Sequence, residues 1–279
     1  MIDRYLAEAK PTKKHRSALS VVKRNIGSVC MAELRTKWVK DYIEKLETQL
    51  TYRKTPYSHA AIAVHLSVMG CVYKWRAEEY DLDLPKLPFS TRHLDKGWEK
   101  NRERRLLASE EKTLISVMRG MKTSKEWLAL LQMALETAAR QQELVLATWS
   151  EISADGLLWT IPAHHSKTKK LRKIPLTDAA IAALQSMKAG KTVQPADRIF
   201  SFLSNASSAC SAFRKITRIA GIEGFRFHDL RHEAVSRMVL YWQQYNVFEI
   251  MQIVGHSSSE MLHRYANLRG EELVAKMRK

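Results

Sequence analysis

Apolar side chains recur at helical spacing through residues 1–85, with charged side chains between them. They fall three or four positions apart, which places them on one face of a helix and predicts amphipathic helices. Pro11 separates the first two segments, and Thr55-Pro56-Tyr57 is expected to open a further helix through Ala60–Trp75. The pattern predicts four or five helices. Its apolar positions are Ile2, Tyr5, Leu6, Leu19, Val22, Ile26, Trp38, Tyr42, Ile43 and Leu46.

The helical pattern is interrupted after residue 80. Asp81–Pro88 holds two prolines, and the segment that follows is mixed in charge and ends in the basic run Lys100–Arg105. Proline lacks the backbone N–H that a helix interior needs, so a helix is not expected to continue here. We therefore expect a first helical domain over residues 1–85, a linker over 86–105 and a second domain over 106–279.

The second domain mixes helical and strand patterns. Ser109 is expected to cap a helix, and the apolar stretch Trp127–Thr148 predicts one or two buried helices. Leu157–Pro162 and Lys173–Leu176 predict two short strands around a basic turn, and helices are expected again from Asp178. The expected fold class is mainly α with a small antiparallel β-sheet, in two domains.

Charge adds a partner to this picture. The 279 residues hold 46 Lys and Arg against 29 Asp and Glu, a formal net charge of +17. Residues 1–100 carry +7 of it and residues 101–279 carry +10. A basic tail would concentrate the excess at one end, so two basic folded surfaces facing a polyanion are favoured over a charge that serves only solubility.

The three cysteines, Cys30, Cys71 and Cys210, are widely spaced and form no Cys-x-x-Cys pair. This spacing disfavours a disulfide framework or a structural zinc site and favours a reducing cytosol. The N-terminus is charged where a signal peptide needs an apolar core, and the longest apolar run is too short to span a bilayer. No membrane association is expected.

Residues 227–265 hold the candidate chemistry. His228-Asp229-Leu230-Arg231, then Gly255-His256 and then Tyr265 are side chains suited to a phosphodiester. Arginine holds phosphate oxygens with parallel hydrogen bonds, histidine donates or moves a proton, and tyrosine can attack phosphorus. Taken singly, each has a plainer interpretation, such as a surface ion pair for His228 and Arg231 or a packed aromatic for Tyr265. Their joint spacing favours a site.

The strings FHDLRHEAVSRM and VGHSSSEMLHRYANL resemble the second conserved region of the tyrosine recombinases, or phage-type integrases. Thr137–Leu144 resembles the first region, with Ala138 where that family usually has glycine, which suggests a slightly different turn. His165–Lys170 resembles the hairpin that carries the family's lysine, here Lys167. The ending RYANL is more similar to phage integrases and shufflon-type inversion recombinases than to chromosome-resolution enzymes of the Xer type.

The resemblance implies a role for six residues. Arg140 and Arg231 would clamp two non-bridging oxygens of the scissile phosphate, and His256 would donate another hydrogen bond. Tyr265 would be the nucleophile and form a 3′-phosphotyrosine. His228 would act as base or proton relay, and Lys167 as the general acid for the 5′ oxygen. Glu143 is expected to orient Arg140 or a nearby histidine.

The resemblance also implies a fold and partners. The N-terminal helices would form a core-binding, SAM-like domain and the rest a tyrosine recombinase catalytic domain. The expected partners are double-stranded DNA and accessory DNA-bending or directionality proteins, and the expected assembly is a homotetramer on two duplexes. The expected location is the cytoplasm of a bacterium, in association with the nucleoid. No metal or cofactor is expected. Basic side chains that are candidates for DNA contacts, or equally for a solvated surface, are Lys13, Lys14, Arg53, Lys54, Lys169, Lys170 and Arg172.

Three alternatives stay open at this point. His228 and His232 lie four apart, with Glu233, His256 and His263 nearby, so a zinc-dependent phosphohydrolase is conceivable. That alternative leaves Arg140, Lys167 and Tyr265 without a role. The other two share the fold: a DNA-binding protein without catalysis, and a DNA-relaxing enzyme of the type IB topoisomerase kind.

Overall fold

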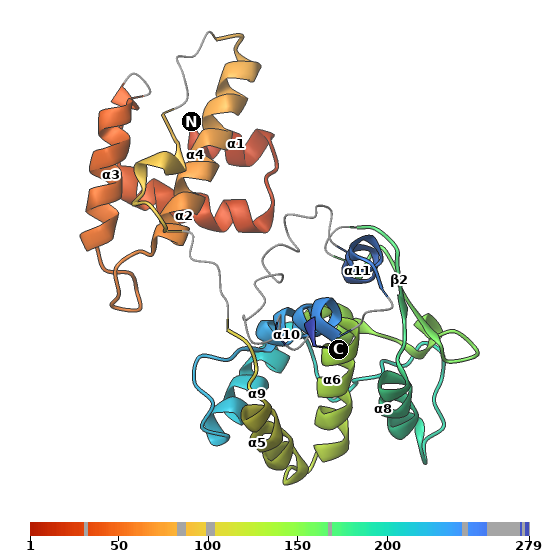
Figure 1. Cartoon of the computed structure of the whole chain (residues 1–279). Coiled ribbons are helices and arrows are strands. Elements are labelled where there is room, and N and C mark those ends of the chain that lie inside the picture. Colours follow the sequence, from red (N-terminus) through yellow and green to blue (C-terminus); the bar gives the residue numbers. More distant parts are fainter. Residues whose placement is uncertain are drawn as a thin grey trace. The chain divides into compact units, whose positions relative to one another are not determined.

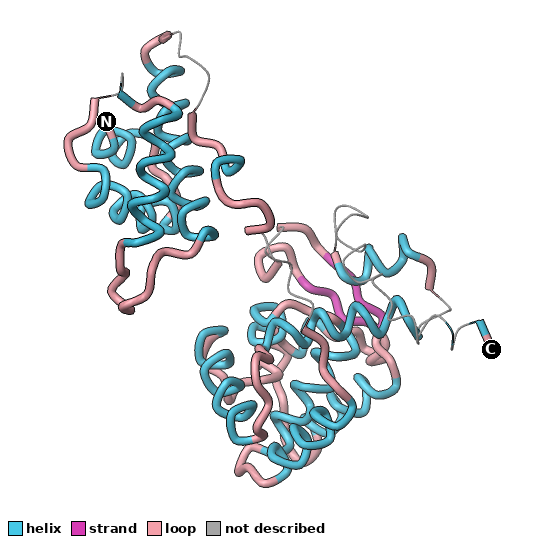
Figure 2. Tube along the Cα trace, turned by 60° about the vertical axis from the view of Figure 1, so that its left-hand side comes forward, coloured by secondary structure: helices cyan, strands magenta, loops and turns pink. Residues whose placement is uncertain are grey.

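The computed structural model describes residues 1–30, 33–82, 88–98, 104–166, 169–241, 245–255, 274, 277 and 278. The chain divides into two compact units, Met1–Asn101 and Arg102–Lys279 (Figure 1). Helices dominate both units, and the described residues form one two-stranded sheet (Figure 2). The prediction of a mainly α fold with a small antiparallel sheet is confirmed. None of the helices in these ranges combines the length and apolarity needed to cross a bilayer.

Four α-helices and a short 3-10 helix are described in the N-terminal unit. Thr12 and Ser58 cap the second and fourth α-helices through their side-chain oxygens, which accept from His15 N and Ala61 N. The fourth helix begins later than predicted, because Leu50 and Pro56 pair in an isolated bridge and the chain turns between them. The elements are α1 (Ile2–Glu8), α2 (Lys13–Ile26), α3 (Thr36–Thr48), α4 (His59–Glu79) and η2 (Thr91–His93).

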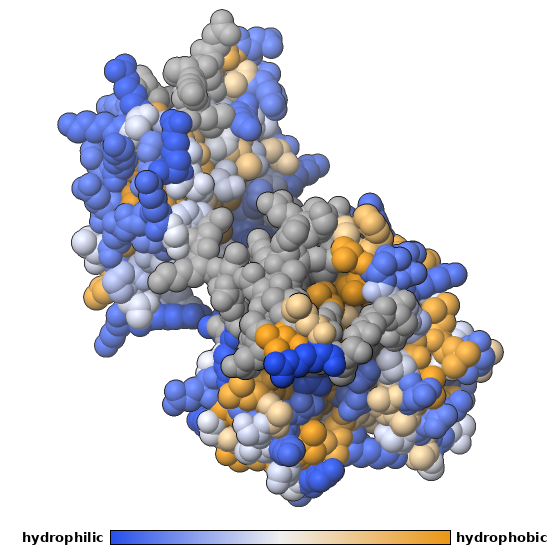
Figure 3. Space-filling view, in the orientation of Figure 1, coloured by the Kyte–Doolittle hydropathy of each residue, from blue (hydrophilic) through white to orange (hydrophobic). Residues whose placement is uncertain are grey.

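The core of this unit is built from the apolar faces that the periodicity predicted. Leu19, Leu46 and Ile62 are fully buried in it. Leu94 is also part of this core, so some of the segment over 86–105 contributes to the first unit as well as connecting the two. On the face shown in Figure 3, hydrophilic side chains cover most of this unit.

The C-terminal unit contains the sheet and the remaining helices. The predicted apolar stretch Trp127–Thr148 forms two helices, which separate at Ala138. Ala138 has φ 48° and ψ 24°. The alanine therefore adopts the left-handed conformation that glycine favours. The elements are α5 (Ala108–Arg119), α6 (Ser124–Thr137), α7 (Gln141–Leu146), η3 (Trp149–Glu151), β1 (Leu158–Ile161), β2 (Arg172–Pro175), α8 (Asp178–Lys188), α9 (Ala206–Ile219), α10 (Phe227–Tyr241) and α11 (Val247–Val254).

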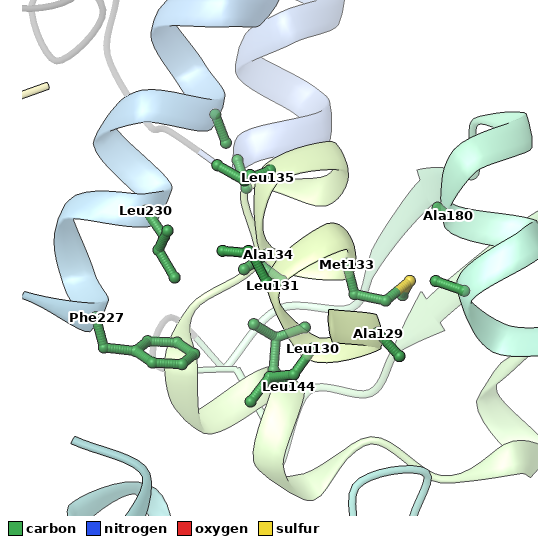
Figure 4. Packing of buried hydrophobic residues seen from close by; sticks show 14 of the residues in the cluster. Ala129, Leu130, Leu131, Met133, Ala134, Leu135, Leu144, Ala180, Phe227 and Leu230 are labelled. Atoms are coloured by element: carbon green, nitrogen blue, oxygen red, sulfur yellow. The ribbon is translucent and has the colours of Figure 1, made fainter. Parts of the chain in front are cut away.

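Helix α6 is the centre of this unit. Leu130 and Ala134 face Phe227 and Leu230 of α10, while its opposite side packs on α8 at Ala180 (Figure 4). Helix α6 is apolar nearly all round, as expected of a helix buried between two others. It therefore holds in place the two segments, α7 and α10, that carry the predicted arginines.

The sheet follows the predicted strands. β1 and β2 pair antiparallel, with Leu158 opposite Pro175 and Ile161 opposite Arg172. Side chains alternate across a strand, so Arg172 and Ile174 share the buried face while Lys173 is exposed.

The cap predicted at Ser109 is wrong. Helix α5 begins at Ala108, and the Glu110 carboxylate accepts from Leu107 N at 3.0 Å. Arg104 also donates to Glu110. The Glu110 side chain thus caps the backbone N–H of Leu107, and Ser109 lies within the first turn of the helix.

Glu233 of α10 is the centre of a buried ionic network. Its carboxylate accepts from Arg105 Nε at 3.0 Å, from Leu106 N at 3.2 Å and from Arg237 Nε at 2.9 Å. Arg237 continues to Glu111 at 2.6 Å. Burial raises the pKa of Glu233, but the hydrogen bonds from Arg105 and Arg237 outweigh it and lower the pKa overall. The network ties the start of this unit to α10.

We expect Glu233→Gln to lower the free energy of unfolding at neutral pH by about 3 kcal/mol, because two arginines lose their buried counter-ion. A lowered folded-state pKa means that Glu233 stabilises the protein above its unfolded pKa of about 4.3. That contribution is lost as the pH falls below this value, so the variant should lose less stability there than the unchanged protein. Urea denaturation between neutral and acidic pH measures both effects. Glu223→Gln, at an exposed glutamate, is the control, and equal behaviour of the two variants would contradict the network's role.

Candidate active site

Three of the six predicted catalytic residues lie in the described part of the chain. Arg140 is the N-cap of α7, and His228 and Arg231 lie in the first two turns of α10. Lys167, His256 and Tyr265 lie outside the described residues. The residues directly before Lys167 and directly before His256 are described, so the structure shows how the chain is held up to each of these two positions.

Arg231 is buried, with 5% of its surface exposed. Its Nη1 donates to Ala138 O, at the end of α6, and its Nη2 donates to Val254 O at 2.8 Å. The guanidinium therefore joins three segments that are distant in the sequence. Two carbonyl acceptors hold the planar group in one orientation, which a phosphate clamp requires.

Arg140 lies at the same place. Its Nη1 donates to Glu143 at 3.1 Å, and its Nη2 donates to Gly255 O at 3.4 Å. Glu143 also accepts from Arg140 N at 2.7 Å, so one carboxylate caps α7 and orients the arginine at its start. Glu143 itself is 1% exposed, as expected of a residue that acts on its neighbour. Its predicted effect on Arg140 agrees with this geometry, and the catalytic role stays a proposal.

Arg172 differs from its prediction. Its place among the basic hairpin residues predicts an exposed side chain that could contact DNA, but only 7% of it is exposed. Its Nη2 donates to Glu143, and its Nη1 donates to Ile253 O at 2.8 Å and Val254 O at 2.6 Å. The alternation of β2 turns this side chain inward. Arg172 thus lies beside Arg140 and Arg231, with which it shares the partners Glu143 and Val254 O.

These groups meet at the C-terminal end of α11. Asn246 caps the helix start, where its side chain accepts from Glu249 N and Glu249 accepts from Asn246 N. Gly255 ends the helix with φ 71°, the left-handed conformation that glycine adopts readily. The last carbonyls of a helix lack partners within it and carry a partial negative charge. Three arginines satisfy them here, next to the position of His256.

The cluster formed by Arg140, Arg172, Arg231 and Glu143 carries a net positive charge. The pKa of Arg172 lies below its ordinary value. Burial lowers it most, and the charge of Arg140 lowers it further, while Glu143 raises it only in part. An arginine nevertheless stays protonated at neutral pH. The region is therefore suited to an anion such as a phosphodiester.

His228 is exposed in the first turn of α10, and its ring meets that of His232 edge to face at 5.0 Å. Besides these two histidines, the zinc alternative drew on Glu233, and on His256 and His263, which lie outside the described residues. The Glu233 carboxylate is instead shared between Arg105 and Arg237. This ionic network disfavours the metal-dependent alternative at that position.

The residues before Lys167 are anchored. His165 Nδ1 lies 2.8 Å from Glu151 Oε1, and the second oxygen of Glu151 accepts from Trp159 Nε1 at 2.8 Å. Ser166 is buried. The residues directly before Lys167 are thus held in place by the rest of the unit.

The other candidate DNA contacts are exposed. Lys13 and Lys14 lie in the first turn of α2. Arg53 Nε donates to Tyr52 Oη at 2.8 Å in the turn after α3. Side chains of this kind reach a phosphate backbone without a local rearrangement, so their role stays a prediction. The exposed candidates are Lys13, Lys14, Arg53, Lys54, Lys169 and Lys170.

Comparison with known proteins identifies the family. The sequence model of the Phage integrase family matches residues 104–272. The chain belongs to the phage integrase family. It is also 36% identical to the shufflon-specific DNA recombinase of Escherichia coli over 176 residues, which are 63% of this chain and 43% of that protein. The chain thus spans less than half the length of this curated integrase relative.

Solved integrase structures share the fold. The Tn1549 transposon integrase in complex with a circular intermediate DNA matches with a TM-score of 0.74 at 15% identity, over 99% of this chain and 96% of that one. The lambda integrase tetramer bound to a Holliday junction matches with a TM-score of 0.67 at 18% identity, over 95% and 74%. At these identities the likeness concerns the fold.

In this chain, a side chain at Gly255 is expected to destabilise the fold. A Cβ at Gly255 would lie 2.9 Å from Arg172 Cδ, and φ is positive. We expect Gly255→Ala to cost roughly 1 kcal/mol from the backbone and about 1 to 3 kcal/mol more from the contact, because Arg172 is held by several hydrogen bonds. Gly190→Ala has the same backbone strain, at φ 75°, and no atom within 4 Å. Urea denaturation compares the two, and equal losses would show that Arg172 yields to the new methyl group.

Proposed function

We propose that this chain is a site-specific DNA recombinase that cleaves and rejoins DNA strands through a covalent 3′-phosphotyrosine, for integration, excision or inversion of a mobile element. The observation that carries the proposal is the meeting of Arg140 and Arg231 at the end of α11, directly before His256. Membership in the phage integrase family supports it.

The two arginines would offset the negative charge that the phosphate gathers as it is attacked. Arg140 and Arg231 would hold the two non-bridging oxygens, with His256 as a further donor. Donors held in place before the reaction need no reorganisation, and each typically contributes about 100- to 1,000-fold in rate. The carbonyls and Glu143 that hold both guanidinium groups support such preorganisation.

The remaining residues would move protons and form the covalent bond. The Tyr265 oxygen would bond to phosphorus while the bond between phosphorus and the 5′ oxygen breaks. His228 would accept the phenol proton, directly or by relay, and Lys167 would protonate the 5′ oxygen. The ester retains the energy of the broken bond, so a 5′-hydroxyl from another strand can reverse the step.

Double-stranded DNA is the proposed substrate, bound by the basic surfaces of both units. We also propose a homotetramer on two duplexes, in line with the tetramer of the lambda integrase on a Holliday junction. Accessory DNA-bending or directionality proteins and association with the nucleoid complete the proposal.

The test uses purified protein and nicked duplexes that tile the DNA flanking its gene. A nick close to the cleavage point lets the short 5′-hydroxyl fragment diffuse away, so the covalent complex accumulates. We expect an SDS-resistant protein–DNA complex in excess EDTA, with the protein on the 3′ end and a free 5′-hydroxyl. Failure on all duplexes, or activity only after zinc is added, would overturn the proposal.

A second arm separates recombination from the alternatives of the same fold. Two supercoiled plasmids that carry the mapped site should exchange strands. Relaxation without exchange would identify a topoisomerase-like enzyme instead, and binding without cleavage a non-catalytic protein.

A further inference from the structure

We propose that Arg172 is a positioning residue, which holds Arg140, Arg231 and the backbone before His256 in the arrangement that cleavage needs. This inference rests on the proposed function, because that function assigns the phosphate clamp to Arg140 and Arg231. The hairpin sequence predicts a DNA contact or a solvated side chain for Arg172, whereas its position in β2 points elsewhere.

Burial separates Arg172 from the basic residues around it. Lys169, Lys170 and Lys173 of the same hairpin are exposed, whereas Arg172 is buried on the face that it shares with Ile174. In the part of the chain that the structure describes, the Arg172 Nε–H is also buried and has no hydrogen-bond acceptor. The hydrogen bonds that Arg172 does make go to Glu143 and to the carbonyls of Ile253 and Val254, so its guanidinium is engaged with the protein groups that surround Arg140 and Arg231.

Arg172 is linked to Arg140 through one carboxylate. Glu143 Oε2 accepts from both Arg172 Nη2 and Arg140 N, and Glu143 Oε1 accepts from Arg140 Nη1. Without Arg172, the Glu143 carboxylate would be free to rotate about its side-chain bonds. Arg140 would then lose the fixed direction of its main partner.

Arg172 is linked to Arg231 through one carbonyl. Val254 O accepts from Arg172 Nη1 at 2.6 Å and from Arg231 Nη2 at 2.8 Å. Ile253 O accepts from Arg172 as well. Both carbonyls belong to the last turn of α11, so Arg172 fixes the helix end to which Arg231 is attached.

Arg172 also lies against the backbone directly before His256. Its Cδ occupies the space where a side chain at Gly255 would begin. The α11 end is therefore held by hydrogen bonds and by direct contact with one side chain. Since His256 follows Gly255, a displacement of this end would move the histidine together with the clamp. A shift of about 1 Å at a reacting centre costs on the order of 100-fold in rate.

The test compares Arg172→Met and Arg172→Lys with Lys173→Met, the matched control. Lys173→Met removes the same charge from the next residue of the strand, on its exposed face. DNA affinity and the single-turnover rate of covalent complex formation are measured separately on the nicked duplex, and thermal unfolding reports on the fold. We expect Arg172→Met to lower the rate by about 10- to 100-fold with little change in affinity, as losses of orienting partners do.

Arg172→Lys should recover the rate only in part, because an ammonium cannot span Glu143 and two carbonyls as a guanidinium does. Lys173→Met should change the rate little. If Arg172→Met fails to fold, Arg172→Lys still carries the test, and an unchanged rate in it would overturn the proposal.

A double-mutant cycle separates positioning from a general loss of stability. Because Arg172 acts partly through Arg140 and partly through the end of α11, Arg172→Met should slow cleavage less in the Arg140→Ala background than in the unchanged protein. Fully additive losses, or a fall in affinity as large as the fall in rate, would overturn the positioning role. Absence of the covalent complex in the unchanged protein would overturn the proposed function and this inference together. A complex that forms at the same rate in Arg172→Met would overturn the inference alone.

Discussion

Tyr265→Phe is expected to abolish the covalent protein–DNA complex and to leave DNA binding unchanged. The substitution removes only the oxygen that would bond to phosphorus and retains the aromatic ring. Because Tyr265 lies outside the described residues, its assignment rests on the sequence pattern alone. The measurement is SDS gel electrophoresis of protein incubated with the nicked duplex, together with a binding titration.

The control for this substitution is Tyr245→Phe. Tyr245 is partly buried and packs against the core of the same unit, so its replacement should leave the complex intact. Survival of the complex in Tyr265→Phe would mean that another of the nine tyrosines is the nucleophile. Loss of the complex only in Tyr245→Phe would identify Tyr245 as the nucleophile.

Arg231→Ala should lower the single-turnover cleavage rate by about 100- to 1,000-fold. DNA affinity should fall far less, because most of the affinity comes from phosphate contacts spread over both basic units. The substitution also removes the Arg231 donor to Ala138 O and one of the two arginine donors to Val254 O. Rates are therefore compared at a temperature where thermal unfolding shows the variant to be folded.

Arg218→Ala, at an exposed arginine of α9, is the control for the loss of one positive charge. It should leave the cleavage rate near that of the unchanged protein. Equal losses of rate and affinity in Arg231→Ala would contradict the clamp and would indicate an arginine that only binds DNA or only stabilises the fold.

The secondary structure was largely predictable because it depends on local patterns. The buried α6 and the strand pair β1–β2 were predicted from apolar periodicity and confirmed. Errors occurred at helix starts. The helix after Pro56 begins at His59, and α5 begins before Ser109. In both cases a specific side chain, Ser58 or Glu110, satisfies the first backbone N–H groups and decides the boundary.

The site was only partly predictable. The resemblance to the tyrosine recombinases indicated Arg140, Glu143 and Arg231, which the structure brings close together, whereas Arg172 was expected on the exposed hairpin and is buried. One signal was available. Arg172 lies two and four positions before Ile174 and Leu176. Side chains two apart in a strand point to the same face, so Arg172 is placed on the inward face of a half-buried strand. That spacing indicated burial, although it did not name the partners.

Local patterns in the sequence were enough to predict the helices, the two short strands and the basic character of both units, and to select side chains suited to a phosphodiester. These properties follow from short-range periodicity and from side-chain chemistry. The folded structure was needed to show that three arginines, from the start of α7, from β2 and from α10, share the last carbonyls of α11. Such a meeting depends on how α6 packs between its neighbours, and long-range packing leaves no local pattern in the chain.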